Sequence, residues 1–213
     1  MTSPLWITQL TPDLRSRDAT RDLRDAVRLH HRIMSLFPSD LGEQARHDAG
    51  VLFRIEETQA GVAVLVQSAV EASRAALPDG YGTVRSKTLT PLLDALAPGR
   101  RVRYRITANA TRKLGLNTTA GRPKEVVPLH GAEAEEWWQR QAESSGLSLH
   151  TLESTPLDQA TGTRRDKNRV VHARTRFDGL ATVTDPAALS SRLRVGIGRG
   201  KAYGCGLLTL APA

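Results

Sequence analysis

Residues 97–109 read APGRRVRYRITAN, a turn-rich break followed by a strand pattern. The Ala-Pro-Gly-Arg segment contains the two residues that most often interrupt helices and strands. From Arg101 onward, basic and apolar residues alternate, which predicts a β-strand with one face on a core. A break in the middle of a chain of 213 residues favours two domains of about 100 residues each. We place the boundary here and predict domains at 1–96 and 97–213.

The second half continues in the order β-α-β-β-α-β. Acidic residues followed by a tryptophan pair predict a helix over 131–146, with Gly146 as its C-terminal cap. Strands are predicted at 147–154 and 170–183, on either side of a basic turn at 158–168. A short helix begins near Asp185, and residues 206–211 form the last strand. This order is typical of a ferredoxin-like domain.

The first half repeats the opening of that order. An amphipathic helix is predicted over about 21–37, with Asp18 or Thr20 as its N-cap. The alternating or apolar segments around it predict strands at 5–10, 51–57 and 61–68, with a short helical piece at 70–77 and an extended piece at 80–86. We therefore predict an α+β fold of two tandem ferredoxin-like (RRM-like) domains.

Charge is distributed unevenly along the chain. Lys and Arg number 30 against 22 Asp and Glu, a net charge of +8, and residues 95–124 contain no acid at all. Residues 162–176 carry six Lys or Arg against Asp166, and the tail beyond Asp185 is again free of acid. A single basic run usually marks a solvated surface, but three such blocks favour a nucleic acid as partner. Because aromatic residues make up only 4% of the chain, we expect recognition of phosphates and duplex shape rather than base stacking.

The remaining composition predicts a soluble cytoplasmic protein. Cys205 is the only cysteine, so an intramolecular disulfide or a thiolate metal site is excluded. No segment approaches the ~20 apolar residues of a membrane span, and we predict no membrane partner. The six histidines lack the spacing of a metal site, and neither a metal nor another cofactor is predicted.

Two adjacent histidines lie in the first predicted helix, which reads VRLHHRIMSLFP over 27–38. At 100° per residue, His30 falls within the apolar arc of this helix, whereas His31 points toward its polar side. On spacing alone, His30 is more simply a core histidine bonded to a backbone carbonyl than a reactive group. The alternative is that this part of the arc lines a cleft, where His30 meets a substrate.

The segment GIGRGKAYGCG at 196–206 is unusually rich in glycine. It matches neither the phosphate-binding Walker pattern nor a dinucleotide-binding GxGxxG. Close approach of the backbone to an anion is one interpretation, with Arg199 and Lys201 adding charge, and a tight structural connection is the other. The glycines concerned are Gly196, Gly198, Gly200, Gly204 and Gly206.

Four segments together resemble the CasE-type CRISPR repeat endoribonucleases of the type I-E Cascade complex. They are RLHHRIMSLFP at 28–38, VLVQS at 64–68, RITANATRKL at 105–114 and GIGRGKAYGCGLLTLAP at 196–212. The matches occur in the family's order and span nearly the whole chain. The glycine-rich ending is shared with the wider superfamily of repeat-associated RNA-binding proteins, whereas Leu-His followed by Leu-Phe-Pro is the narrower marker.

The resemblance implies two ferredoxin-like domains and metal-independent cleavage of the CRISPR precursor transcript at the base of a repeat hairpin. It also implies that the mature guide RNA stays bound during assembly with the other Cascade subunits. The catalytic histidine of the family maps to His30. The basic hairpin that contacts the RNA duplex maps to Arg164, Arg165, Lys167 and Arg169. From the basic segments we add Arg112, Lys113, Arg199 and Lys201 as candidate RNA-binding residues.

Some family members carry a tyrosine three residues before the histidine, where this chain has Val27, and an Asn-Pro pair where this chain has Asn109-Ala110. We therefore expect His30 to act with water, or with Tyr203 or His31. Without a metal, the ribose 2′-OH attacks the adjacent phosphate and yields a 2′,3′-cyclic phosphate and a 5′-OH. A histidine, which titrates near neutral pH, suits either proton transfer in that reaction. The competing hypothesis is a non-catalytic subunit that binds guide RNA, and a DNA-binding protein is third because no helix-turn-helix is recognisable.

Overall fold

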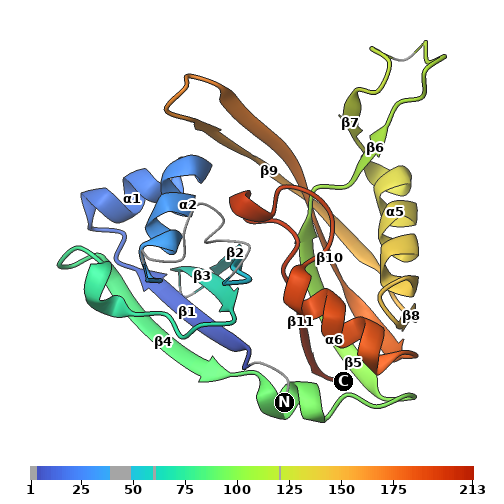
Figure 1. Ribbon diagram of the computed structural model, residues 1–213, viewed down its shortest axis with the longest axis horizontal. Coiled ribbons are helices and arrows are strands. Elements are labelled where there is room, and N and C mark those ends of the chain that lie inside the picture. Colours follow the sequence, from blue (N-terminus) through green and yellow to red (C-terminus); the bar gives the residue numbers. More distant parts are fainter. Residues whose placement is uncertain (1–3, 39–48, 60, 120) are drawn as a thin grey trace.

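Two antiparallel sheets, one from each half of the chain, form the framework of the computed structural model (Figure 1). The structure describes residues 4–38, 49–59, 61–119 and 121–213. Each sheet has four strands along its main path. When these four are numbered in chain order, both sheets have the order 4-1-3-2 of a ferredoxin-like domain. The predicted α+β fold with two ferredoxin-like domains is therefore confirmed. Within the described residues, no helix is long and apolar enough to cross a membrane.

The first sheet has the order β2-β3-β1-β4. Its strands are β1 (Trp6–Pro12), β2 (Leu52–Thr58), β3 (Gly61–Ser68) and β4 (Gly82–Thr88). Helices α1 (Arg17–Leu23) and α2 (Ala26–Met34) follow β1, and the 3₁₀ turn η2 (Arg74–Ala76) is all that forms of the helix predicted at 70–77. Leu29 and Ile33 of α2 are buried with Phe53, Val64 and Tyr81 in the core of this half.

The second sheet has the order β11-β5-β10-β8, and β9 also pairs with β10. Its strands are β5 (Arg101–Ala108), β8 (Leu147–Leu149), β9 (Glu153–Thr163), β10 (Arg169–Val183) and β11 (Leu208–Pro212). The core lies between this sheet and helices α5 (Gly131–Glu143) and α6 (Pro186–Val195), with the Trp138 ring stacked on Phe177 at 5.8 Å between centroids. Asp185 caps α6 by accepting bonds from the amides of Ala187 and Ala188, as its position before Pro186 predicts.

Three connections were not predicted. Helix α4 (Thr90–Asp94) lies between β4 and β5, so the expected boundary at 96/97 falls in the link between the two sheets. Strands β6 (Thr111–Lys113) and β7 (Val126–Pro128) form a separate two-stranded ribbon that projects beside α5 (Figure 1). The 3₁₀ turn η3 (Lys201–Tyr203) lies inside the glycine-rich segment.

The single helix predicted over 21–37 is wrong, since the chain forms two helices that meet at Arg24 and Asp25. Ser16, rather than Asp18 or Thr20, caps the first of them. The carboxylate of Asp25 accepts bonds from two amides of the second helix and so begins a new helix within the apolar pattern. Apolar periodicity alone does not reveal such a break, because Leu23 of the first helix and the apolar residues of the second fall within one arc of a continuous helix.

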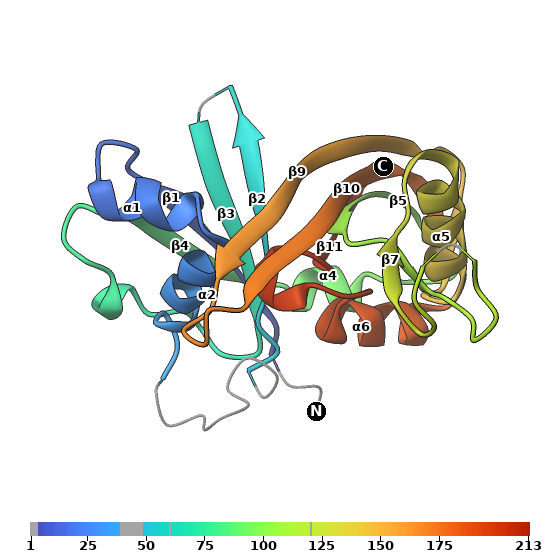
Figure 2. The same cartoon turned by 90° about the horizontal axis from the view of Figure 1, so that it is seen from above.

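The basic turn predicted over 158–168 is also too long. Strand β9 extends to Thr163 and pairs with β10 as far as Arg169, so the turn itself covers only a few residues (Figure 2). The outer part of this hairpin reaches beyond the sheet toward α1 and α2. Its polar sequence, LDQATGT at 157–163, lacks the apolar alternation of a sheet strand because that part does not cover the core of the second domain.

A buried arginine joins the two halves of the molecule. The Arg54 side chain on β2 is almost fully buried, and its guanidinium donates to the backbone carbonyls of Arg105 on β5 (3.0 Å) and of Leu207, just before β11 (3.1 Å). It also donates to the Thr209 hydroxyl at 3.0 Å and to Glu56 at 2.7 Å. Burial lowers the pKa of Arg54, while Glu56 counteracts that effect.

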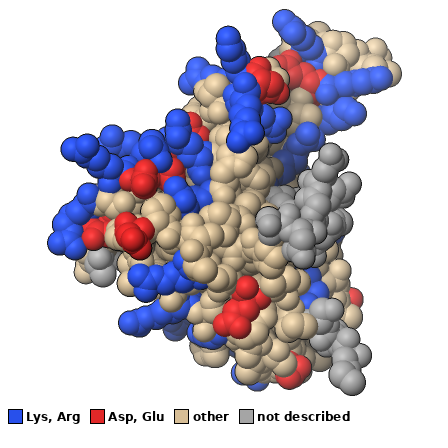
Figure 3. Space-filling view, turned by 60° about the vertical axis from the view of Figure 1, so that its left-hand side comes forward, with Lys and Arg blue, Asp and Glu red and all other residues tan. Residues whose placement is uncertain are grey.

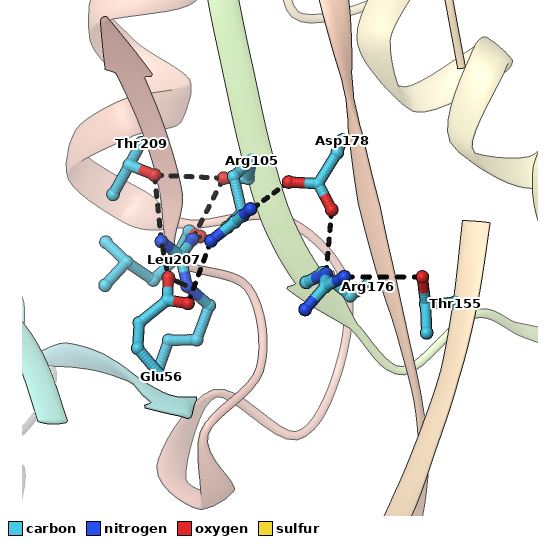
Figure 4. Close-up of polar contacts among 8 residues, drawn as sticks. Glu56, Arg105, Thr155, Arg176, Asp178, Leu207 and Thr209 are labelled. Carbon is cyan, nitrogen blue, oxygen red and sulfur yellow. Dashed lines mark hydrogen bonds and ion pairs between the residues drawn. The ribbon is translucent and has the colours of Figure 1, made fainter. Parts of the chain in front are cut away.

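The network continues across the second sheet (Figure 4). Arg105 donates to Glu56 at 3.0 Å and to Asp178, and Asp178 also accepts from Arg176 at 2.7 Å. A second link between the halves is the Gln67 amide, which donates to the carbonyl of Leu193 at 2.5 Å. Where the domains meet, Glu56 and Asp178 thus pair with three guanidinium groups, those of Arg54, Arg105 and Arg176, so one positive charge is left over.

Replacing Arg54 tests this junction. We expect Arg54→Ala to lower the free energy of unfolding by about 3 kcal/mol, because it removes one of the two arginine partners of the partly buried Glu56 and the guanidinium donors to two backbone carbonyls. Arg140→Ala removes an exposed pair with Glu136 and should cost less than about 0.5 kcal/mol. Urea unfolding followed by circular dichroism measures both, and equal losses would show that the network does not hold the domains together.

Candidate active site

Helix α2 is held firmly at its first turn and along its polar side. The Asp25 carboxylate accepts from the amides of Val27 (2.8 Å) and Arg28 (2.9 Å). Asp22 at the end of α1 is buried and accepts from Arg32 of α2 at 2.8 Å. The Arg32 guanidinium also lies 4.9 Å from the centre of the Tyr81 ring. These contacts give α2 a defined orientation relative to the first sheet.

The outer part of the β9–β10 hairpin lies directly on the first turn of α2. A Cβ atom built on Gly162 of β9 would be 2.6 Å from Asp25 Oδ1 and 2.9 Å from Val27 Cγ2. Only glycine fits at this distance, and the contact leaves Val27 7% exposed. Val27 therefore serves as a packing residue against the second domain at the position where some family members have tyrosine.

His30 lies on the side of α2 that faces the second domain. It is half-buried, and its ring centroid is 6.1 Å from that of Tyr203 with an interplanar angle of 63°. His31 is exposed, and its ring centroid is 5.6 Å from that of His30. The apolar arc of α2 thus has two parts. Leu29 and Ile33 pack into the first core, whereas His30 reaches the boundary between the domains.

Tyr203 brings three segments of the chain together. Its hydroxyl oxygen accepts two bonds from the Arg164 guanidinium, at 3.1 Å from Nε and 3.0 Å from Nη2. Its ring stacks on that of His172 of β10, with centroids 5.2 Å apart and planes 24° apart. A small hollow beside Tyr203 is lined also by Leu29 of α2 and Thr161 of β9. The helix, the hairpin and the glycine-rich segment therefore converge here.

Sequence reasoning missed His172. It lies half-buried in the basic segment after the hairpin turn, and its Nδ1 is 2.9 Å from the side-chain amide nitrogen of Asn109. Burial lowers the pKa of His172, and the positive charges of Arg199 and Arg164 lower it further. No local spacing in the sequence distinguishes this histidine, because its partners come from 31 to 63 residues away.

The glycine-rich segment is a sharply folded connection between α6 and β11. Gly196, Gly198, Gly200, Gly204 and Gly206 all have positive φ, between 72° and 87°. A Cβ atom on Gly196 would be 2.7 Å from Leu52 Cδ2 in the first domain, and one on Gly206 would be 2.7 Å from the carbonyl oxygen of Ile197. This packing places Tyr203 against α2.

Lys201 and Arg199, the two basic residues of this segment that we predict to bind RNA, differ in their contacts. The Lys201 ammonium donates to the Val195 carbonyl at the end of α6, at 2.7 Å. Arg199 is exposed, and its backbone forms a β-bridge with Asn109. Burial raises the pKa of the neighbouring Cys205 thiol to about 12, so this cysteine stays protonated and is not a nucleophile at neutral pH.

The predicted basic hairpin residues are exposed at the tip of β9 and β10. The Asp166 carboxylate accepts from the Asn168 amide and stabilises the turn, in which Lys167 has a φ of 62°. The exposed residues are Arg164, Arg165, Lys167 and Arg169. Figure 3 shows Lys and Arg side chains gathered over the upper part of one face of the molecule.

The structure does not bring Arg112 and Lys113 to this cluster. Both lie on β6, in the ribbon beside α5, and both views place that ribbon apart from α2 (Figures 1 and 2). Arg112 forms an exposed ion pair with Glu133 at 3.2 Å. Among the residues that the structure describes, no three His, Cys, Asp or Glu side chains are grouped so that they could hold a metal ion.

The geometry unites groups that transfer protons with groups that attract anions. Imidazole and phenol rings lie within one cluster, and guanidinium groups border it from the hairpin tip and the glycine-rich segment. Such a combination suits acid–base chemistry on a phosphate ester, because the cations stabilise negative charge that develops in the transition state.

Comparison with known proteins identifies the family. The model of the family described as CRISPR associated protein matches residues 5–212. The chain is 33% identical to the CRISPR-associated endoribonuclease Cse3 of Thermus thermophilus, over 98% of this chain and all of the relative. It is 29% identical to the CRISPR system Cascade subunit CasE of Escherichia coli, over 89% of this chain and 93% of that protein.

A solved structure shows the same similarity in three dimensions. Thermus thermophilus Cse3 bound to an RNA representing a pre-cleavage complex superposes with a TM-score of 0.81 and 32% identity, covering 98% of this chain and all of that one. The four matching sequence segments, the two ferredoxin-like sheets and these relatives agree. This chain belongs to the CRISPR-associated protein family, as a member of its CasE (Cse3) type.

Proposed function

We propose that this chain is an endoribonuclease that binds the hairpin of CRISPR repeat RNA, cleaves the precursor transcript and remains with the mature guide RNA as a Cascade subunit in the cytoplasm. The observation that carries the proposal is the convergence of His30, Tyr203 and Arg164 from three segments at one point. The names of the relatives support it, since one is an endoribonuclease and another a Cascade subunit.

His30 is the proposed proton-transfer group. The chemistry needs a base for the ribose 2′-OH, an acid for the departing 5′ oxygen, and cations near the phosphorane. One histidine supplies either proton transfer, and water or Tyr203 supplies the other. Tyr203 is the better placed of the two auxiliary candidates, because His31 is exposed whereas the phenol oxygen is fixed by two donors of Arg164.

Arg164 and Arg199 are the proposed cations of the site, and the outer hairpin residues Arg165, Lys167 and Arg169 are the proposed contacts to the RNA duplex. Arg164 has a double role in this proposal, since it belongs to the hairpin and also contacts Tyr203. Arg112, Lys113 and Lys201 remain candidates for binding RNA outside the cleavage point. We propose that the reaction needs neither a metal ion nor another cofactor.

A non-catalytic subunit that binds guide RNA is the second candidate function. The observation in its favour is Val27, which cannot transfer a proton and instead packs on Gly162. Cleavage and binding are measured separately in the experiments below, so each outcome assigns the chain to one of the two functions.

Replacing His30 separates these functions. We expect His30→Ala to slow single-turnover cleavage of a synthetic CRISPR repeat hairpin by about 10²- to 10⁴-fold, in excess EDTA, because the proton-transfer group is lost. Affinity for the RNA, measured by filter binding, should stay within about twofold, since one imidazole adds little to a phosphate-dominated interface. His150→Ala is the matched control, because His150 is exposed and its ring is hydrogen-bonded to Thr182, away from the candidate site. Unchanged cleavage by His30→Ala would remove this residue from the site.

The nucleophile is tested in the RNA rather than in the protein. A repeat hairpin with 2′-deoxyribose at the nucleotide before the cut should bind with unchanged affinity and remain intact, because the attacking hydroxyl is absent. Deoxyribose one nucleotide further along serves as the control and should be cut at the normal rate. Gel analysis of the ends should find a cyclic phosphate. Cleavage of the deoxy-substituted hairpin at the normal rate would contradict the mechanism.

The hairpin tip is tested by its salt dependence. The double variant Arg165→Ala, Lys167→Ala should weaken binding of the repeat hairpin at least about tenfold and reduce the slope of log affinity against log salt by about 1 to 2, because two phosphate contacts are lost. Cleavage at saturating enzyme should change little. The control is Arg101→Ala, Arg103→Ala, which removes two exposed arginines from β5. Equal weakening in the control would mean that total charge matters and not the hairpin.

A further inference from the structure

The rings of His30, His31, His172 and Tyr203 form an aromatic cluster. His172 is the one member of this cluster to which the proposed function gives no role. It lies on β10, just beyond the turn that carries Arg164, and the plane of its ring is nearly parallel to that of Tyr203. His30 meets the same phenol nearly edge to face. Tyr203 is therefore in contact with one histidine from each domain, and these two contacts differ in geometry.

The His172 ring is fixed by a buried partner. Asn109 is 5% exposed, and its side-chain amide donates to Nδ1 of His172 at 2.9 Å. In the tautomer in which Nδ1 accepts this bond, that nitrogen carries no proton and the ring is neutral. Asn109 is itself held by its backbone bridge to Arg199, and a Cβ atom on Gly200 would touch the ring at 3.5 Å. The strand, the amide and the glycine-rich segment together determine the plane of the imidazole.

The charges around His172 favour the same neutral state. Arg164 approaches from the hairpin turn and Arg199 from the glycine-rich segment, and both lower the pKa of the imidazole in addition to its burial. Tyr203 covers its face, and His30 lies beyond Tyr203 on α2. A neutral, flat ring can pack between these cations without adding repulsion, and it gives the phenol a rigid surface.

On the basis of the function proposed above, we propose that His172 is a positioning residue, which stacks on Tyr203 and, held by Asn109, sets the angle at which the phenol meets His30 and Arg164. His172 acts through Tyr203 and transfers no proton itself. The aromatic face of the residue is therefore what the reaction requires, and its ring nitrogens serve only to hold that face in place.

Two substitutions at position 172 separate the contribution of the flat aromatic face from that of the ring nitrogens. His172→Leu keeps much of the volume but removes the flat ring, whereas His172→Phe keeps the flat ring and removes the nitrogens. We expect His172→Leu to slow single-turnover cleavage of the repeat hairpin about tenfold to hundredfold, since a small misplacement of a catalytic group is costly. His172→Phe should cleave several-fold faster than His172→Leu and stay within about tenfold of the unsubstituted protein, because the stacking surface is restored although the bond from Asn109 is lost. Affinity for the deoxy-substituted hairpin should be unchanged in both, and His150→Ala is again the control.

A double-mutant cycle tests whether His172 acts through Tyr203. The double variant His172→Leu, Tyr203→Leu should cleave no more slowly than Tyr203→Leu alone, because the group that His172 positions is already absent. Additive losses would overturn the proposal, and so would a His172→Phe protein as slow as His172→Leu. If His172→Leu fails to fold, the rate of His172→Phe decides alone, with retention supporting the proposal and a loss above about tenfold refuting it. Absence of cleavage by the unsubstituted protein would instead refute the proposed function, on which this role rests.

Discussion

The position of one buried guanidinium determines the geometry on which the candidate site depends. His30 belongs to the first domain, whereas Tyr203 and Arg164 belong to the second, so their separation is set by how the two sheets meet. Arg54 crosses that junction with bonds to two carbonyls and a hydroxyl of the second domain. Burying a charge is costly unless every donor finds a partner, and the Arg54 guanidinium meets that condition only in this arrangement of the domains. The network thus favours one relative orientation over others that bury a similar apolar area.

Steric contacts then bring the residues of the candidate site together. Gly162 lets the hairpin lie on the N-terminus of α2, and Gly196 lets the chain turn against Leu52 at the base of the glycine-rich segment. A side chain at either position would meet another group at 2.6 to 2.7 Å, so neither contact could form without displacement. Two elements of the second domain therefore approach α2, one carrying Arg164 and the other Tyr203. The density of glycine in the last segment reflects this packing between domains, in addition to any role in binding RNA.

The sequence predicts the fold more fully than it predicts the site. Alternation in strands such as 101–109 and the order of elements identify both ferredoxin-like domains, because these patterns follow from local burial. The break between α1 and α2 escapes detection, since Asp25 interrupts a continuous apolar arc through a side-chain bond. The length of β9 escapes it too, because its outer part is mostly polar and lacks apolar alternation. Helical phase alone favours a core histidine at position 30, and the family resemblance makes His30 the catalytic candidate. The role of position 27 depends on Gly162, which lies 135 residues away in sequence. The contact between His172 and Asn109 forms only when β5 and β10 pair in the second sheet, so the sequence alone does not indicate it.

The hydrogen bonds of Tyr203 connect RNA binding to chemistry. Its oxygen accepts two N–H groups from Arg164, so the bond that remains available to the hydroxyl is the donation of its own proton. A phosphate oxygen is a strong acceptor for that proton, and a guanidinium next to it stabilises the same negative charge. Arg164 extends from the turn whose neighbouring basic side chains, the proposed contacts to the RNA duplex, are exposed. An RNA seated on the hairpin would therefore place its backbone near the phenol and near His30. On the proposed function, recognition of the repeat and orientation of His30 and Tyr203 would then depend on the same arginine, at the point where the basic hairpin and the glycine-rich segment meet α2.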